Sequence, residues 1–197
     1  MQNTPSFSDG TSPSPADATT AVMRGIAIRM APPFGKAFFN NLVYTLGFLR
    51  VVGEVEGAAA VDRAGTGKIH RRGDNRADDT ADQFQLWIRH GASSPESTAA
   101  IARVQRMHDH FSRTYAFSNE TYVHGIALFT LLFDEIFGHV GIDAFSEAEK
   151  DAQVQHWRTI AEQMHVKDVP TTWAGMQQAL RTYETSPDWY RRTPAGQ

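Results

Sequence analysis

NETYVHGIALFTLLFDEIF, residues 119–137, is the stretch of sequence that decides the fold. Its apolar residues recur at helical spacing, and they leave almost no polar face around the helix axis. A helix that is apolar on most sides must be surrounded by other elements to remove that surface from water. Residues 119–137 are therefore predicted to form the central helix of a packed domain.

The sequence on either side predicts further helices with clear start and stop signals. Ser94 and Pro95 occupy the favoured N-cap and first helical positions, and SEAE at 146–149 is a capping-box pattern. No segment alternates with the period of two that is typical of a strand. The fold class is therefore all-α, a single helical domain of about six to eight helices. Besides 119–137, helices are predicted over residues 22–30, 37–52, 76–90, 95–111, 146–165 and 172–184.

The helical domain is expected to span residues 22–186, between two tails. Residues 1–21 are rich in Ser, Thr, Pro and Asp and contain no basic residue, so we predict a disordered N-terminal tail. Residues 187–197 begin with proline and are predicted to form a C-terminal tail. Residues 62–75 combine glycine with many charges and are predicted to form a loop.

The composition excludes several classes of function. Nineteen basic residues against 22 acidic ones lack the positive excess that nucleic-acid binding requires. The absence of cysteine excludes disulfides, zinc–thiolate sites and iron–sulfur clusters, and it is consistent with a cytoplasmic protein. Asn40, Asn41 and Arg50 interrupt the most apolar run, so no transmembrane span is predicted. A core helix is the favoured interpretation of that run, and peripheral contact with a membrane is the alternative.

The predicted helix 95–111 gives its two histidines opposite environments. His108 continues an apolar stripe that contains Ile101, Val104 and Phe111, whereas His110 lies on a charged face. His108 is therefore expected to point inward and His110 toward solvent. A hydrogen-bonded core histidine is the ordinary interpretation of such a position. A neutral imidazole among apolar helices is also what a non-covalent haem requires as its iron ligand.

Arg76 and Thr80 stand one helical turn apart, so their side chains reach the same side of the predicted helix 76–90. An arginine can pair with a carboxylate such as a haem propionate, and a threonine hydroxyl can donate a hydrogen bond to bound oxygen. The ordinary interpretation is that Arg76 pairs with Asp79 or Asp82 at the surface, while Thr80 caps or packs.

The order of several short motifs resembles the MpaB and rubber-oxygenase (latex-clearing protein) family over about residues 75–185. The late YE at 183–184 belongs to the same series. Each motif is short, and the resemblance rests on their order and separation, including the 28 residues from Thr80 to His108. The motifs are NRADDT at 75–80, AIARVQRMHDHF at 100–111, FSNETYVHGIALF at 117–129, SEAEKDAQVQHW at 146–157 and EQMHVKDVP at 162–170.

The resemblance implies a globin-like helical core, a haem b cofactor, and dioxygen as co-substrate in the cleavage of carbon–carbon double bonds of isoprenoid chains. In that family the histidine that matches His108 ligates the iron, and the residues that match Arg76 and Thr80 belong to the haem pocket. The expected partner is thus a hydrophobic, unsaturated or isoprenoid small molecule. Rubber-cleaving members carry a lysine where this chain has Asp79, so it looks closer to the MpaB branch.

Two alternatives remain open at the level of sequence. The first is a non-catalytic helical protein that binds haem or a hydrophobic ligand, because no motif identifies a catalytic base. Glu54 and Glu56 lie in a plausible upstream region, but surface carboxylates are their default interpretation. The second alternative is a non-haem iron protein that uses Glu120, His124, Glu135 and His139, although the Glu-to-His spacing of four departs from the Glu-x-x-His pattern.

Overall fold

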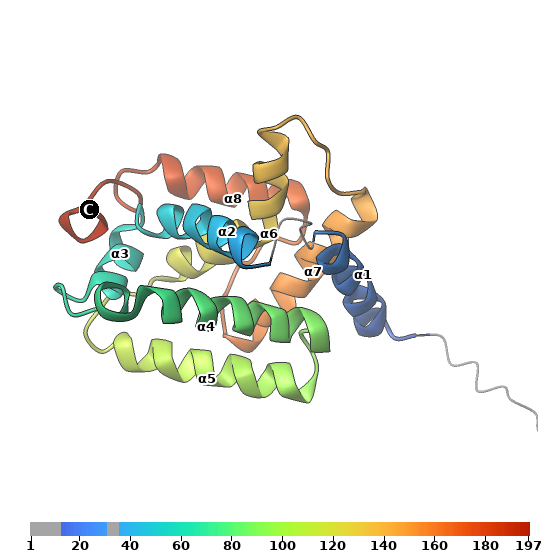
Figure 1. Ribbon diagram of the computed structural model, residues 1–197, viewed down its shortest axis with the longest axis horizontal. Helices are drawn as coiled ribbons and strands as arrows, with labels where there is room; N and C mark the ends of the chain where they lie inside the picture. The colour runs from blue at the N-terminus through green and yellow to red at the C-terminus, as the bar shows by residue number, and fades with distance from the viewer. Residues whose placement is uncertain (1–12, 31–35) are drawn as a thin grey trace, which may run out of the picture.

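The computed structural model describes residues 13–30 and 36–197, and helix α6 (Asn119–Gly138) runs through the middle of them (Figure 1). Ala127, Leu128 and Leu131 on α6 are at most 1% exposed. Helices α2, α7 and α8 pack around α6. The prediction of a central helix is confirmed, because the apolar sides of α6 are covered from several directions.

The described residues contain eight α-helices and no β-strand, so the all-α prediction is confirmed. Ser94, Ser118 and Ser146 each cap a helix, with the side chain accepting a hydrogen bond from a backbone N–H in the first turn. No helix in the described ranges has the length and hydropathy needed to cross a bilayer. The other elements are α1 (Pro15–Arg29), α2 (Lys36–Val51), α3 (Val55–Asp62), α4 (Lys68–His90), α5 (Pro95–Phe111), α7 (Glu147–Gln163), α8 (Trp173–Thr185) and a 3₁₀ turn (Pro194–Gly196).

The N-terminal helix starts earlier than the predicted boundary of the tail. Residues 1–12 lie outside the described residues, but α1 begins at Pro15, where Ser14 and Asp17 form a capping box. Met23 and Ile26 on α1 are buried and pack with Phe145. The Ser- and Pro-rich composition led to the prediction of a tail up to residue 21. A helix forms there instead, and burial of its later residues stabilises it.

Residues 62–75 are not the continuous loop that their composition predicts. Helix α3 ends at Asp62 and α4 already begins at Lys68, with a break in helical geometry at Arg72 (φ −149°, ψ 52°). Lys68 forms an ion pair with Asp79 across this break. The segment is therefore a helix with a kink at Arg72, not an irregular loop. Its charged side chains remain on the outside.

The C-terminal segment 187–197 packs against the molecule instead of forming a free tail. The Val55 N–H donates to the Trp189 carbonyl at 2.9 Å, and the Arg191 N–H donates to the Gly53 carbonyl at 2.9 Å. A Cβ at Gly53 would lie 2.4 Å from the Tyr190 ring, so only glycine allows this approach. The segment is ordered by contacts with residues far away in the sequence.

Two regions of the fold bear on function (Figure 1). Helices α4 and α5 lie side by side along one face, and α1 packs against α7 at one end of the molecule. Between these regions, Phe84, Phe129 and Trp157 join α4, α6 and α7 through edge-to-face ring contacts of 4.8 to 5.1 Å. The aromatic cluster holds the two regions in one hydrophobic core.

His156 on α7 is buried in this core without a polar partner. It is 1% exposed, and neither ring nitrogen has a hydrogen-bond partner among the described residues. Burial lowers the pKa of His156 to about 4. The imidazole is therefore neutral at pH 7, which is the form that costs least to bury.

The buried His156 should make the protein less stable in mild acid. Its pKa is lower in the folded than in the unfolded chain, so its contribution is present above the ordinary value of 6.5 and is lost as the pH falls toward 4. This linkage corresponds to about 3 kcal/mol over that range. Urea unfolding should show the pH dependence in the wild type and show it reduced in His156→Phe. An identical pH dependence in both proteins would contradict the prediction.

Candidate functional site

His108 lies on the inward side of α5, as its position in the apolar stripe predicts. Its ring centroid is 5.6 Å from that of Phe117 and 5.4 Å from that of Tyr122. The Nδ1 atom is buried and has no hydrogen-bond partner among the described residues. His110, by contrast, is exposed. The opposite assignment of the two histidines is confirmed, and His108 leaves a buried nitrogen unused.

Burial lowers the pKa of His108, and the nearby Asp109 carboxylate only partly opposes this. The imidazole is therefore neutral at pH 7. A neutral imidazole can offer a nitrogen lone pair to a metal ion, whereas a protonated one cannot. Aromatic neighbours on one side and a lowered pKa leave the His108 imidazole neutral and partly enclosed.

Arg76 on α4 points its guanidinium over the Phe48 ring of α2, with Cζ 5.6 Å from the ring centroid. Its Nε atom is buried and has no hydrogen-bond partner among the described residues. The expected surface pair of Arg76 with Asp79 or Asp82 is not found among the described residues, and Asp79 pairs with Lys68 instead. Arg76 therefore keeps hydrogen-bonding capacity for a group that these contacts do not supply.

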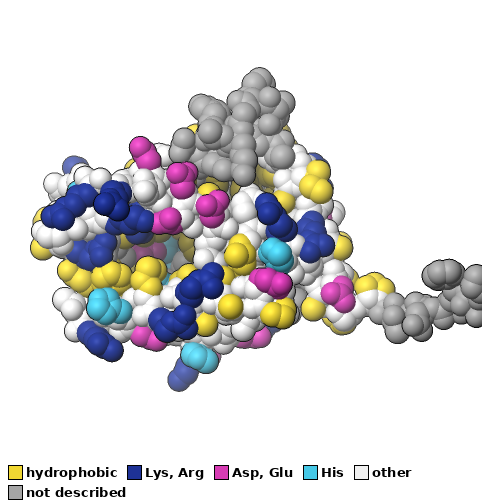
Figure 2. Space-filling model, turned by 60° about the horizontal axis from the view of Figure 1, so that its bottom comes forward, with side chains coloured by type: hydrophobic (Ala, Val, Ile, Leu, Met, Phe, Trp, Pro, Cys, Tyr) yellow, Lys and Arg dark blue, Asp and Glu magenta, His cyan; other side chains and the backbone are white. Residues whose placement is uncertain are grey.

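The Thr80 hydroxyl donates to the Arg76 carbonyl at 3.0 Å, which is the ordinary contact of a threonine inside a helix. No hydrogen bond or ring contact within the described residues joins Arg76 or Thr80 to His108. The three residues lie on α4 and α5, which pack against each other. Figure 2 turns this side of the molecule forward and shows a hollow in it, with Lys and Arg side chains and hydrophobic side chains at its rim.

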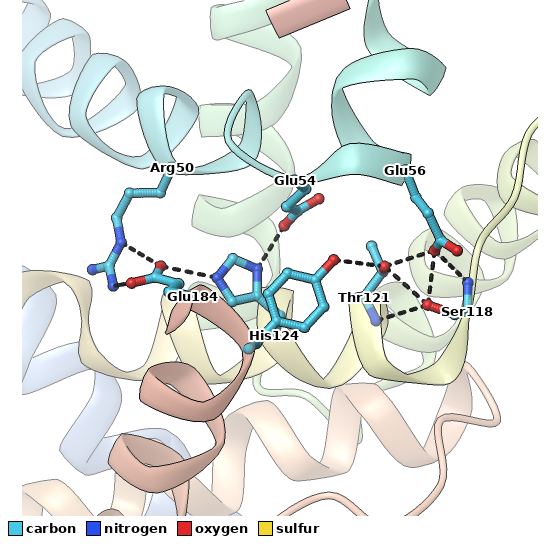
Figure 3. Close-up of polar contacts among 8 residues, drawn as sticks. Arg50, Glu54, Glu56, Ser118, Thr121, His124 and Glu184 are labelled. Atoms are coloured by element: carbon cyan, nitrogen blue, oxygen red, sulfur yellow. Dashed lines mark hydrogen bonds and ion pairs between the residues drawn. The ribbon is translucent and has the colours of Figure 1, made fainter. Parts of the chain in front are cut away.

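A second group of polar side chains surrounds His124 on α6, which is 1% exposed (Figure 3). Its Nδ1 lies 2.6 Å from Oε1 of Glu54, and its Nε2 lies 3.0 Å from Oε1 of Glu184. Arg50 holds the Glu184 carboxylate from the other side through Nε at 2.8 Å and Nη2 at 2.6 Å. Arg50 also pairs with Glu135. The imidazole is thus held between two carboxylates. We call Arg50, Glu54, His124 and Glu184 the clamp.

The electrostatics of this buried group favour a protonated imidazole. Burial opposes the charge, but hydrogen bonds to Glu184 and Glu54 raise the pKa of His124. Burial raises the pKa of Glu54 despite the His124 hydrogen bond. Burial works in the same direction at Glu184, but hydrogen bonds from His124 and Arg50 lower the pKa of that carboxyl. The hydrogen bonds thus favour the charged forms of His124 and Glu184, whereas burial favours the protonated form of Glu54.

Glu56 forms a neighbouring polar cluster at the start of α6 (Figure 3). Its Oε2 accepts hydrogen bonds of 2.7 Å from the Ser118 N–H, the Ser118 hydroxyl and the Thr121 hydroxyl. The Thr121 hydroxyl also lies 2.9 Å from the Tyr183 hydroxyl, and the Tyr183 ring stacks on His124 at 4.3 Å. Glu56 therefore ties the beginning of α6 to α3 and adjoins the clamp.

The default interpretation of Glu54 as a surface carboxylate is wrong, because Glu54 is 4% exposed. Gly57 is the sequence feature that could have indicated a buried Glu54. A Cβ at position 57 would lie 1.9 Å from Oε2 of Glu54. A glycine three residues after a glutamate in a short helix can make room for a carboxylate folded back on the backbone. The sequence alone does not show which partner that carboxylate meets.

The structure does not assemble the four residues of the non-haem iron hypothesis. His124 is held by Glu54 and Glu184, and Glu135 by Arg50. The Nδ1 of His139 instead lies 2.6 Å from the Glu135 carbonyl at the end of α6. Within the described ranges, no three or more His, Asp or Glu side chains are grouped so that they could hold a metal ion.

Comparison with known proteins identifies one family. The family model described as "ER-bound oxygenase mpaB/B'/Rubber oxygenase, catalytic domain" matches residues 40–193. The matched range covers the clamp around His124 as well as His108, Arg76 and Thr80. A search of curated proteins gives no match. Because the match extends over most of the chain, the protein belongs to the mpaB/rubber oxygenase catalytic-domain family.

Proposed function

We propose that the protein is a haem-b-dependent oxygenase that uses dioxygen on a hydrophobic, unsaturated or isoprenoid substrate. Membership of a family named for oxygenases supports the reaction class. The observation that carries the cofactor assignment is His108, whose buried Nδ1 has no partner and whose pKa burial lowers. His108 is the proposed iron ligand.

The residues of α4 and α5 have the chemistry that this cofactor requires. Haem needs apolar walls, one nitrogen donor and cationic partners for its propionates. Phe117 and Tyr122 supply aromatic surface beside His108, and the buried Nε of Arg76 has no competing partner. Arg76 is therefore the proposed partner of a propionate. Thr80 could donate to a bound ligand only by giving up its bond to the Arg76 carbonyl.

When bound, haem supplies an iron centre at which dioxygen can be activated. The protein provides the rest. His108 stays neutral because burial disfavours its charged form, so its lone pair remains available. Its aromatic neighbours exclude water from that side of the imidazole. The charge of Arg76 would orient the cofactor by pairing with a propionate. The site then has a polar edge and an apolar interior.

A binding protein without turnover is the second candidate, and the hydrogen bonds of the two upstream carboxylates favour it. Glu54 is bonded to His124, and three donors converge on Glu56. Oε1 of Glu54 and Oε2 of Glu56 are therefore already engaged, and these two oxygens are not available to accept a proton from a substrate in this arrangement. Incubation of reduced, haem-loaded protein with oxygen and prenylated alkenes separates the two functions: aldehyde or ketone fragments indicate an oxygenase, and their absence across the panel indicates a binding protein.

Haem titration tests the cofactor assignment directly. The purified protein, shown to be folded by its helical circular dichroism, should develop a Soret band that saturates at about one haem per chain. The reduced form should give the pyridine haemochrome spectrum of haem b after extraction. A folded protein that develops no Soret band on addition of haem would contradict the assignment.

A further inference from the structure

A cavity of about 350 Å³ lies where the first two turns of α1, the turn between α4 and α5, and the middle of α7 meet. It is formed by helices other than α5, which carries His108. Figure 1 shows α1 against α7 at this end of the molecule. An apolar cavity of about 150 Å³ can hold benzene, so this volume accommodates a six-membered ring with a substituent.

The wall formed by α1 is fixed in place by contacts with three other segments. Arg24 Nε donates to the Arg89 carbonyl at 2.6 Å, and Arg29 pairs with Glu149 at the start of α7. Gly91, with φ +85°, allows a close approach at the turn, because a Cβ there would lie 2.2 Å from the Thr20 hydroxyl. The cavity is therefore part of the packed fold.

The lining of the cavity is uncharged, and most of the surface that it exposes is apolar. It consists of small, hydroxyl and amide side chains together with His156, and it includes no Asp, Glu, Lys or Arg. The Thr20 and Thr159 hydroxyls each donate to a carbonyl of their own helix, so their oxygens can still accept a hydrogen bond. An anion would find no positive charge here, and a cation would find no carboxylate.

His156 is the feature that indicates a ligand. It lines the cavity, is 1% exposed, and has two buried nitrogens without hydrogen-bond partners among the described residues. A buried polar group without a partner is costly, and native structures nearly always satisfy such groups with protein atoms, water or a ligand. A neutral imidazole has one nitrogen that donates and one that accepts, so a hydroxyl group suits either.

We propose that the cavity between α1, the α4–α5 turn and α7 binds a small uncharged molecule that carries a hydroxyl group, which hydrogen-bonds to His156. The small lining residues surround the hydrocarbon part, and the threonine oxygens accept any second hydroxyl. This site is separate from the residues proposed to hold haem, so either assignment can fail without the other.

Phenol is a suitable probe, with toluene and benzoate as matched comparisons. Toluene keeps the ring but lacks the hydroxyl, and benzoate replaces it with a charge. Titration of the full chain, followed by NMR of the His156 ring and the Thr159 backbone, should show saturable shifts with phenol. Loss of one neutral hydrogen bond is worth on the order of tenfold in affinity. Toluene should bind about tenfold more weakly, and benzoate should not saturate.

Two variants test whether the shifts arise in this cavity. His156→Phe keeps a planar ring but removes both nitrogens, and Thr19→Leu fills space at the wall without changing His156. Both should weaken phenol binding at least about tenfold, while His139→Phe, at an exposed position just after the end of α6, should not change it. Shifts confined to the surroundings of His108, or equal phenol affinity in the wild type and His156→Phe, would overturn the proposal. A cavity that holds only water would show no saturable shifts, which would also overturn it.

Discussion

Replacing His108 with alanine is expected to abolish stable haem binding, while His110→Ala leaves it nearly unchanged. His108 is half-buried beside Phe117 and Tyr122, whereas His110 is exposed on the same helix two residues later. Loss of an outer-shell partner alone weakens metal sites about 10–100-fold, so loss of the ligand itself should weaken haem affinity by more than roughly 100-fold. Soret titrations of the wild type and both variants measure the difference.

Two further observations separate ligation from a purely structural role of His108. His108→Ala removes a buried nitrogen that has no partner, so its thermal unfolding midpoint should remain close to that of the wild type. Added imidazole should then restore a Soret band in His108→Ala by occupying the vacated space. Equal loss of haem in the two alanine variants would show that His108 is not the ligand.

The second large effect is expected at His124. Its side chain is fully buried between Glu54 and Glu184, so His124→Ala leaves two carboxylates facing each other with one charged partner removed. Breaking a buried ion pair by removing one partner costs about 3–5 kcal/mol. Urea unfolding at pH 7 should show a loss of this size. His139→Ala, at the exposed end of the same helix, loses only one hydrogen bond to the Glu135 carbonyl and should change stability by no more than about 1 kcal/mol.

The pH dependence of this effect follows from the direction of the pKa shift. Hydrogen bonds to Glu184 and Glu54 raise the pKa of His124 above its ordinary value, against the effect of burial. Its contribution is therefore fully present below pH 6.5 and is lost as the pH rises through the folded-state pKa. The wild type and His124→Ala should differ most at acidic to neutral pH and converge in alkali. A difference below about 1 kcal/mol at pH 6 would contradict the role of the clamp.

The clamp is part of the domain that matches the family. Residues 40–193 include Glu54 and Glu184, so the clamp lies within the matched domain. In the present arrangement the clamp joins α2, α3, α6 and α8 around one imidazole (Figure 3). Its first consequence is structural, because it connects the C-terminal helix to the loop at Gly53 that holds the segment 187–197.

The sequence by itself determined most of the helices and the directions of several side chains, but not the short helix α3 (Val55–Asp62). Cap residues such as Ser94 and Ser146 act within one turn, and the spacing of Ile101 and Val104 assigns His108 to the inner face of its helix. These features depend on contacts between residues three to seven positions apart, which a local pattern contains. For the same reason the exposed position of His110 could be predicted without a structure.

Only the tertiary structure decided which polar groups meet. Glu54 and Glu184 are 70 and 60 residues from His124, and no local spacing connects them. The same holds for the burial of α1 against Phe145 and for the cavity beside His156, whereas the start of α1 at Pro15 is marked locally by the capping box of Ser14 and Asp17. The free energy of burying a charge or an imidazole depends on the partners that the packed helices bring to it. Those partners come from distant parts of the chain.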